Sequence, residues 1–142
     1  MDILLTFTGF HDPYFKGLID QEEQLGPILS LLAARPFDRI YLFDTPAAHE
    51  VTKRTAEAIK QRFPNTAITV LAIALDDPTD YKKILKGLRR HIAHILEDNA
   101  GARLYISVAS GTPQMHACWL LLSASGEVPA RILHVRPPRF VT

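Results

Sequence analysis

Residues 104–122, LYISVASGTPQMHACWLLL, decide the fold of this chain of 142 residues. The LYISV part has the aromatic and β-branched residues that are typical of a short buried strand. Ser110, Gly111 and Thr112 then break the apolar pattern, and Pro113 stands at a first helical position, where its missing N–H costs no hydrogen bond. Ser110 or Thr112 is expected to cap the helix that follows. The stretch is therefore predicted to form a strand, a tight polar turn and a helix.

The turn at residues 110–112 gathers groups that attract negative charge. Free N–H groups, hydroxyls and the positive end of a helix dipole would face one point, where a phosphate or another electron-rich group fits. A valine in place of Gly111 is expected to fill this approach and abolish binding while the fold stays intact. A well-capped turn that binds nothing explains the same residues, so the rest of the chain has to decide between the two.

On either side of this stretch, strands alternate with helices. Apolar runs of strand length occupy residues 2–8, 39–43, 67–75 and 131–135. Helical spacing of apolar residues begins near Gln21, becomes regular from Pro27, and returns at residues 47–63, 81–98 and 114–125. Residues 14–21 show no clean period and are expected to form a loop. Thr79 or Asp77 is expected to cap the helix that starts at Tyr81.

This order predicts an α/β fold. Strands that alternate with helices imply a Rossmann-like, doubly wound and mainly parallel sheet with helices on both faces, in a single domain. The chain shows no internal repeat and no linker. The helix at residues 114–125 is apolar nearly all round, so we expect it to be wholly buried or part of an interface.

Composition excludes several classes of function. A net charge of +1 provides no global basic field for binding duplex DNA. One cysteine, Cys118, excludes a disulfide framework and a multi-cysteine zinc site, and it is expected to be an inert core residue. The N-terminus is too short and acidic for a signal peptide, and no apolar run approaches the roughly 20 residues of a membrane helix. We expect a soluble, cytoplasmic domain that does not bind a membrane.

Two polar loops come together by topology. In open α/β sheets the ligand binds at the carboxyl ends of the strands, where the strand order reverses, and the first and fourth strands commonly flank that point. The loops that follow them here are 8–12, TGFHD, and 110–114, SGTPQ. Neither is a GxGxxG or GxxxxGK[ST] motif, so bound NAD or an ordinary nucleoside triphosphate is not expected, and no cofactor is predicted.

These loops carry a resemblance to a known family. SGTPQM at 110–115, after a strand and opening a buried helix, resembles the SGT-x-x-M signature of CRISPR-associated Rossmann-fold (CARF) domains. Thr8, Gly9 and Phe10 fit that family's other ligand loop. The FTGFHDPY opening and the VRPPRFVT ending look like the sensor domains of sigma-54-dependent regulators related to the RNA-repair operon regulator. The resemblance covers essentially the whole chain.

The resemblance implies a ligand sensor. It implies that residues 1–142 form a CARF-like domain that binds a cyclic oligoadenylate, or a related RNA-derived ligand, across the two-fold axis of a homodimer. It also implies control of an effector domain that is absent from this chain, and hence transcription regulation. The family commonly has a lysine two places before the signature Met, and Pro113 and Gln114 occupy that stretch here. This departure favours a sensor over a ring-cleaving enzyme.

The resemblance and the chemistry together give a set of expected ligand contacts. Phosphates would meet the N–H groups of Gly111 and Thr112, 2′-hydroxyls would meet Ser110, Thr112 and Gln114, and Phe10 or His11 would stack on an adenine. Thr45, after the second strand, is expected to border the site. The full set of expected ligand residues is Thr8, Gly9, Phe10, His11, Thr45, Ser110, Gly111, Thr112, Gln114 and Met115.

Two alternative functions stay open. The first is a metal-independent ring nuclease that uses the ligand's own 2′-hydroxyl, with Thr8, His11 and Ser110 as candidate catalytic residues. The second is a dimerisation module whose signature loop binds nothing.

Other polar residues have simpler explanations. Asp12 either pairs with His11 in acid–base chemistry or only forms a turn with Pro13. We expect no metal site. His91 and His94 are one helical turn apart, but the sequence offers no second pair of ligands, so they are expected to lie on a solvated helix face. Arg136 and Arg139 are expected to neutralise phosphate or to contact a downstream domain.

Overall fold

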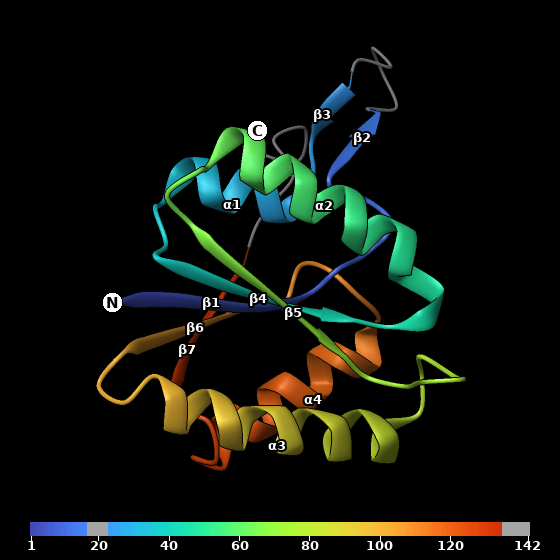
Figure 1. The fold of residues 1–142 in the computed structure, drawn as a ribbon. Helices are drawn as coiled ribbons and strands as arrows, with labels where there is room; N and C mark the ends of the chain where they lie inside the picture. Colours follow the sequence, from blue (N-terminus) through green and yellow to red (C-terminus); the bar gives the residue numbers. More distant parts are fainter. Residues whose placement is uncertain (17–22, 135–142) are drawn as a thin grey trace.

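The computed structural model describes residues 1–16 and 23–134, and in them a five-stranded parallel sheet forms the centre of the molecule (Figure 1). Its strands are β1 (Asp2–Phe7), β4 (Arg39–Asp44), β5 (Ala67–Ala72), β6 (Arg103–Ser107) and β7 (Ala130–Leu133). Their order is β5-β4-β1-β6-β7, with every neighbouring pair parallel. The strand order therefore reverses between β1 and β6, as the sequence predicted.

Helices cover both faces of this sheet (Figure 1). α1 (Pro27–Ala34) and α2 (His49–Arg62) lie on one face, and α3 (Tyr81–Asp98) and α4 (Pro113–Ala124) lie on the other. A short 3₁₀ helix, η1 (Pro46–Ala48), leads into α2. The Rossmann-like α/β fold class is confirmed.

Each face of the sheet has its own apolar core. Under α3 and α4, the rings of Phe7, Phe43 and Trp119 pack together, with centroids 5.2 to 5.9 Å apart. Under α1 and α2, Ile28, Leu29 and other fully buried aliphatic side chains pack on Leu4, Ile40 and Leu42. Strands buried on both faces explain why β1 and β4 read as continuous apolar runs.

The segment after β1 differs from the prediction. β2 (Tyr14–Lys16) and β3 (Glu23–Leu25) pair as an antiparallel hairpin, where the sequence predicted a loop and the beginning of a helix. Leu25 pairs with Tyr14, and both pack beside the core under α1. This pairing between two strands follows no periodic pattern that the sequence could reveal, and α1 begins only at Pro27.

Three helix and strand ends also differ. β5 ends at Ala72, not at residue 75, because its neighbour β4 ends at Asp44 and offers no further partner. α3 is capped by Asp80, whose carboxylate accepts from the N–H of Lys83, while Asp77 binds the N–H and hydroxyl of Thr79. β7 ends at Leu133, and Val135, Arg136 and Arg139 lie outside the described residues.

Within the described part of the chain, no helix is long and apolar enough to cross a membrane.

Candidate ligand-binding site

A pocket of about 330 Å³ lies at the carboxyl end of the sheet, where the strand order reverses. The loops after β1 and β6 form its walls, with further contributions from η1, Pro27 and the loop before α3. It is lined by Thr8, Gly9, Phe10, His11, Asp12, Pro27, Thr45, Ala47, Ala48, Pro78, Ala109, Ser110, Gly111, Thr112 and Met115. All the residues expected to contact a ligand line this pocket except Gln114, which lies in the first turn of α4 between the lining residues Thr112 and Met115.

The two loops touch through their glycines. A Cβ at Gly9 would lie 2.7 Å from the Gly111 nitrogen, which is backbone and cannot move aside as a side chain does. A glycine at position 9 therefore allows the first loop to lie directly against the second. This contact leaves no space for a side chain between them.

Gly111 allows the tight turn to form, and a side chain at this position would point into the apolar core. Its φ is +99°, a conformation that L-residues with side chains rarely adopt. A Cβ there would lie 2.8 Å from Met115 Sδ and 3.1 Å from Phe7 Cβ, both inside the protein. The expectation that a valine would fill the ligand's approach and spare the fold is therefore wrong.

The Thr112 hydroxyl is engaged by the protein on both sides. It accepts from the N–H of Met115 (3.2 Å) and donates to the carbonyl of Pro78 (2.9 Å). Met115 Sδ in turn accepts from the Thr112 N–H at 3.3 Å, which completes a capping box at the start of α4. Thr112, and not Ser110, is thus the cap, and it ties α4 to the loop before α3.

The Ser110 side chain lies in the wall of the pocket, next to the carboxyl of Asp12. The residue is only 4% exposed, and its Oγ has no hydrogen-bond partner among the described residues. Its carbonyl oxygen is fixed by His116 Nε2 at 2.8 Å. The Oε1 of Gln114 is likewise buried and unpaired within the described part of the chain.

Asp12 links three segments at the base of the pocket. Its Oδ2 accepts from the Gly9 N–H (3.0 Å) and its Oδ1 from the Ile28 N–H (3.1 Å) in the first turn of α1. Burial raises the pKa of this carboxyl, opposed by the neighbouring Ser110 hydroxyl, these two N–H groups and the charge of His11. Asp12 is thus more than a turn residue before Pro13.

Two aromatic side chains flank the opening. Phe10 is 81% exposed at the rim of the pocket. The His11 ring stacks on Phe15 of the hairpin, with centroids 5.4 Å apart. Phe10 therefore has an open face for a base, whereas His11 already has one stacking partner.

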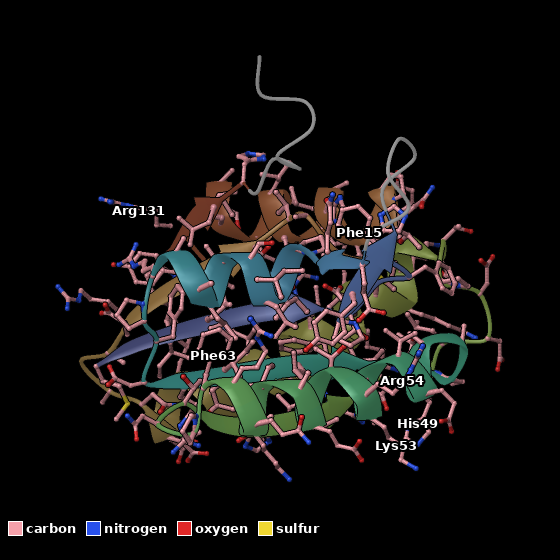
Figure 2. All side chains as sticks on the ribbon, turned by 90° about the horizontal axis from the view of Figure 1, so that it is seen from above. Phe15, His49, Lys53, Arg54, Phe63 and Arg131 are labelled. Atoms are coloured by element: carbon pink, nitrogen blue, oxygen red, sulfur yellow. The ribbon has the colours of Figure 1, made fainter. Side chains whose placement is uncertain are left out.

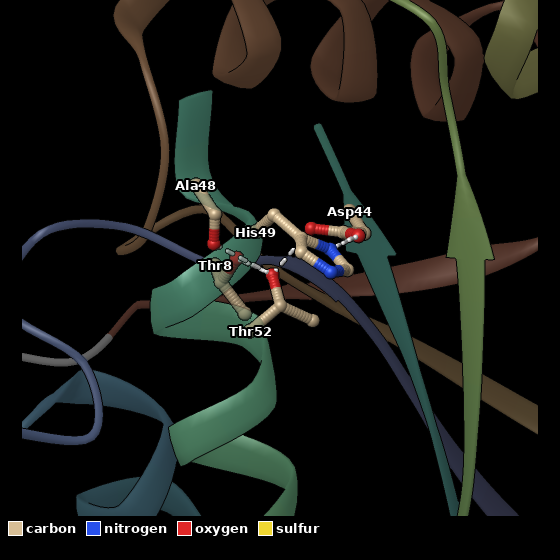
Figure 3. A network of polar contacts seen from close by, with 5 residues as sticks. All are labelled: Thr8, Asp44, Ala48, His49 and Thr52. Carbon is tan, nitrogen blue, oxygen red and sulfur yellow. Dashed lines mark hydrogen bonds and ion pairs between the residues drawn. The ribbon is translucent and has the colours of Figure 1, made fainter. Parts of the chain in front are cut away.

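A buried polar network joins the pocket to the start of α2 (Figure 3). Thr8 Oγ1 lies 2.7 Å from Thr52 Oγ1, and Thr52 lies 2.7 Å from Asp44 Oδ1 and 3.0 Å from the Ala48 carbonyl. Asp44 Oδ2 contacts His49 Nδ1 at 2.8 Å. Figure 2 shows His49 with Lys53 and Arg54 at the outer side of α2. No motif in the sequence marked Thr52 or Asp44 as partners of Thr8.

The remaining candidate groups are structural. Of the two histidines predicted on a solvated helix face, His94 is exposed, whereas His91 is half-buried, with Nε2 2.8 Å from the Ala72 carbonyl and its ring edge-on to Phe43. No cluster of His, Cys, Asp or Glu in the described ranges could hold a metal ion. Cys118 is 1% exposed, and burial raises the pKa of its thiol.

A known protein family matches most of the chain. The model of a family described as "RtcR: Regulator of RNA terminal phosphate cyclase" matches residues 18–141. No curated protein matches the chain significantly.

Solved structures share the fold. Csm6 of Enterococcus italicus, bound to cyclic hexa-2′-fluoro-hexa-dAMP, superposes with a TM-score of 0.82 at 20% identity, over 98% of this chain and 34% of that one. Can2 of Sulfobacillus thermosulfidooxidans, in complex with cyclic tetra-adenylate, superposes with a TM-score of 0.66 at 19% identity, over 96% of this chain and 32% of that one. The chain thus spans about a third of the length of each.

Proposed function

Because the chain belongs to the RtcR family of regulators of RNA terminal phosphate cyclase, we propose that it is a CARF-type sensor of a cyclic oligoadenylate or a related RNA-derived ligand. In this proposal residues 1–142 form the sensor domain of a cytoplasmic transcription regulator, and ligand binding is transmitted to an effector domain. The ligands of Csm6 and Can2, which share the fold, support this choice of ligand class.

The observation that carries the proposal is the pocket between the two signature loops. Phe10 offers an open aromatic face at its rim, and the hydroxyl-bearing residues Thr8 and Ser110 line its wall. Hydroxyl groups and a stacking surface are the groups that bind the backbone and bases of single-stranded RNA. Both come from the loops expected to hold the ligand.

The size of the pocket supports a shared site. About 330 Å³ lies at the lower end of the range of roughly 300–1,000 Å³ found for small-molecule sites, too small for a whole ring of nucleotides. We propose that two copies, related by a two-fold axis, each hold part of the ring. An exposed apolar stripe on α4 supports this helix as the dimer contact. The stripe is formed by Ala117, Leu120, Leu121 and Ala124.

Binding of synthetic rings tests the proposal. The purified chain is titrated with cyclic tetra-adenylate and cyclic hexa-adenylate by calorimetry, and the mixtures are then analysed for linear products by chromatography. We expect one ring to bind and to be recovered intact. Cyclic tetra-uridylate serves as the control for base recognition.

Two glycine variants then locate the site. Gly9→Ala should weaken binding at least tenfold, because its Cβ would push the first loop off the Gly111 nitrogen. Gly101→Ala makes the same substitution far from the pocket, where no atom lies within 4 Å of the new Cβ but the φ of +82° makes the backbone unfavourable. It therefore controls for a loss of stability alone, and it should leave affinity unchanged. Linear product would identify a ring nuclease instead, and no binding of either ring would refute the proposed ligand class.

A further inference from the structure

The direction of the hydrogen bonds around Thr8 determines which ligand groups it can bind. Thr52 Oγ1 has one proton and three close oxygens: Thr8 Oγ1, Asp44 Oδ1 and the Ala48 carbonyl. The ionised carboxylate and the carbonyl can only accept. If the Thr52 proton pointed at Thr8, a carboxylate oxygen would face a hydroxyl oxygen at 2.7 Å with no proton between them. Because the carboxylate is charged and lies closer than the Ala48 carbonyl, the Thr52 proton points at Asp44 Oδ1, and Thr8 donates to Thr52.

His49 reinforces this direction from the other end. Its Nδ1 lies 2.8 Å from Asp44 Oδ2, and the Asp44 side chain is only 8% exposed. An ionised carboxylate accepts from both His49 and Thr52, so both protons point toward Asp44. The network converges on one negative charge, and Thr8 is its last donor before the pocket (Figure 3).

We propose that Thr8 is an obligate hydrogen-bond acceptor at the wall of the pocket, so that it binds an O–H or N–H of the ligand and not a phosphate oxygen. Thr8 lines the pocket, and its own proton is used inside the fold. Phosphate oxygens are acceptors and would meet lone pairs there, with the Asp44 charge behind them. Thr52 and Asp44 act as positioning residues. This inference rests on the proposed function, and it places the phosphates of the ligand away from Thr8.

Two ligand groups have this chemistry in an adenylate ring: the ribose 2′-hydroxyl and the adenine N6 amine. A double-mutant cycle separates them, using whichever ring binds the wild-type chain. One ring lacks the 2′-hydroxyls (all-2′-deoxy), and the other lacks the amine (purine in place of adenine). Each is titrated against the wild-type chain, Thr8→Val and Thr8→Ser.

We expect one of the two altered rings to bind the wild-type chain roughly five- to tenfold more weakly than the parent ring, as for one lost hydrogen bond. Thr8→Val, which removes the acceptor at nearly constant volume, should abolish that difference, and Thr8→Ser should retain it. Thr52→Val frees the Thr8 proton, so the difference should shrink although Thr8 itself is unchanged. Thermal unfolding of each variant shows that it is folded.

The possible failures are distinct. If the wild-type chain binds a ring and neither alteration is coupled to Thr8, the acceptor role is overturned while the proposed function stands. If the wild-type chain binds no ring, the proposed function is overturned, and this inference with it.

Discussion

Asp12 couples the ligand loop to the body of the protein through one carboxylate. Each of its oxygens accepts a backbone N–H, one from Gly9 beside the pocket and one from Ile28 in α1. Burial raises its pKa above the ordinary value of 3.8, because a buried site disfavours the charged form. The folded chain therefore binds this proton more tightly than the unfolded chain does.

This shift gives a pH dependence of defined sign. Stabilisation by the protonated form is complete below pH 3.8 and is lost as the pH rises through the raised, folded-state pKa. We expect the free energy of unfolding of the wild-type chain, relative to Asp12→Asn, to fall with rising pH across that window and then to level off. Urea unfolding at a series of pH values measures the difference, and a difference that rises with pH would contradict the assignment.

At the scale of single residues, the sequence identified the residues of the two pocket loops but not the residues that hydrogen-bond to them. Thr8, Gly9, Ser110 and Gly111 were predictable, because strand order alone brings these loops together. Thr52 was not, because it contacts Thr8 across 44 positions of sequence and its helix reads as an ordinary amphipathic one. Which hydroxyl groups are hydrogen-bonded inside the protein likewise depends on residues that only the folded chain brings near them.

At the scale of elements, Thr112 determines how α4 begins. Its hydroxyl caps the helix and donates to Pro78, so one side chain holds the starts of two elements. Loss of a threonine cap alone costs about 1 kcal/mol, within a range of roughly 0.5–2 kcal/mol. We expect Thr112→Ala to lower the free energy of unfolding by about 1–2 kcal/mol in urea, and Thr112→Ser to lower it much less. Equal losses in the two variants would show that the methyl group, not the hydroxyl, is responsible.

Elements with strong local patterns were predictable, and those held by tertiary contacts were not. α2 and α3 follow from the spacing of their apolar residues, and α4 follows from the capping turn and Pro113 before an apolar run. The hairpin of β2 and β3 was missed because its six residues carry little alternation, and the pairing of Tyr14 with Leu25 stabilises it. The end of β5 depends on the length of β4, which the sequence of β5 does not contain.

At the scale of the molecule, α4 exposes an apolar stripe that a monomer leaves uncovered. Leu120 is 46% exposed and Leu121 is 53% exposed, so the prediction of a wholly buried helix is wrong, while the predicted interface stays a prediction. We expect Leu121→Glu to raise the dimer dissociation constant at least tenfold, because a buried unpaired carboxylate is costly. Light scattering with size-exclusion chromatography measures the mass.

Val70 supplies the matched control for that variant. It is 45% exposed on the edge strand β5, so Val70→Glu adds the same charge at similar exposure away from α4. This variant should leave the mass unchanged. A dimer that survives Leu121→Glu, or one that Val70→Glu breaks, would move the interface away from α4.

The overall topology was the most predictable feature, since alternation of strands and helices leaves few parallel arrangements. The pocket follows from that topology, because the order reverses between β1 and β6. The proton directions inside it follow from atoms that only the folded chain brings together.

The packing of Trp119 gives this protein an optical reporter of its own. Trp119 is the single tryptophan of the chain, it is fully buried, and its ring touches Phe7 and Phe43. Those two residues stand next to Thr8 and Asp44, so a shift of either strand end changes the surroundings of the indole. Its fluorescence can therefore report ligand binding and unfolding in the unlabelled chain, and the whole tryptophan signal comes from this one position.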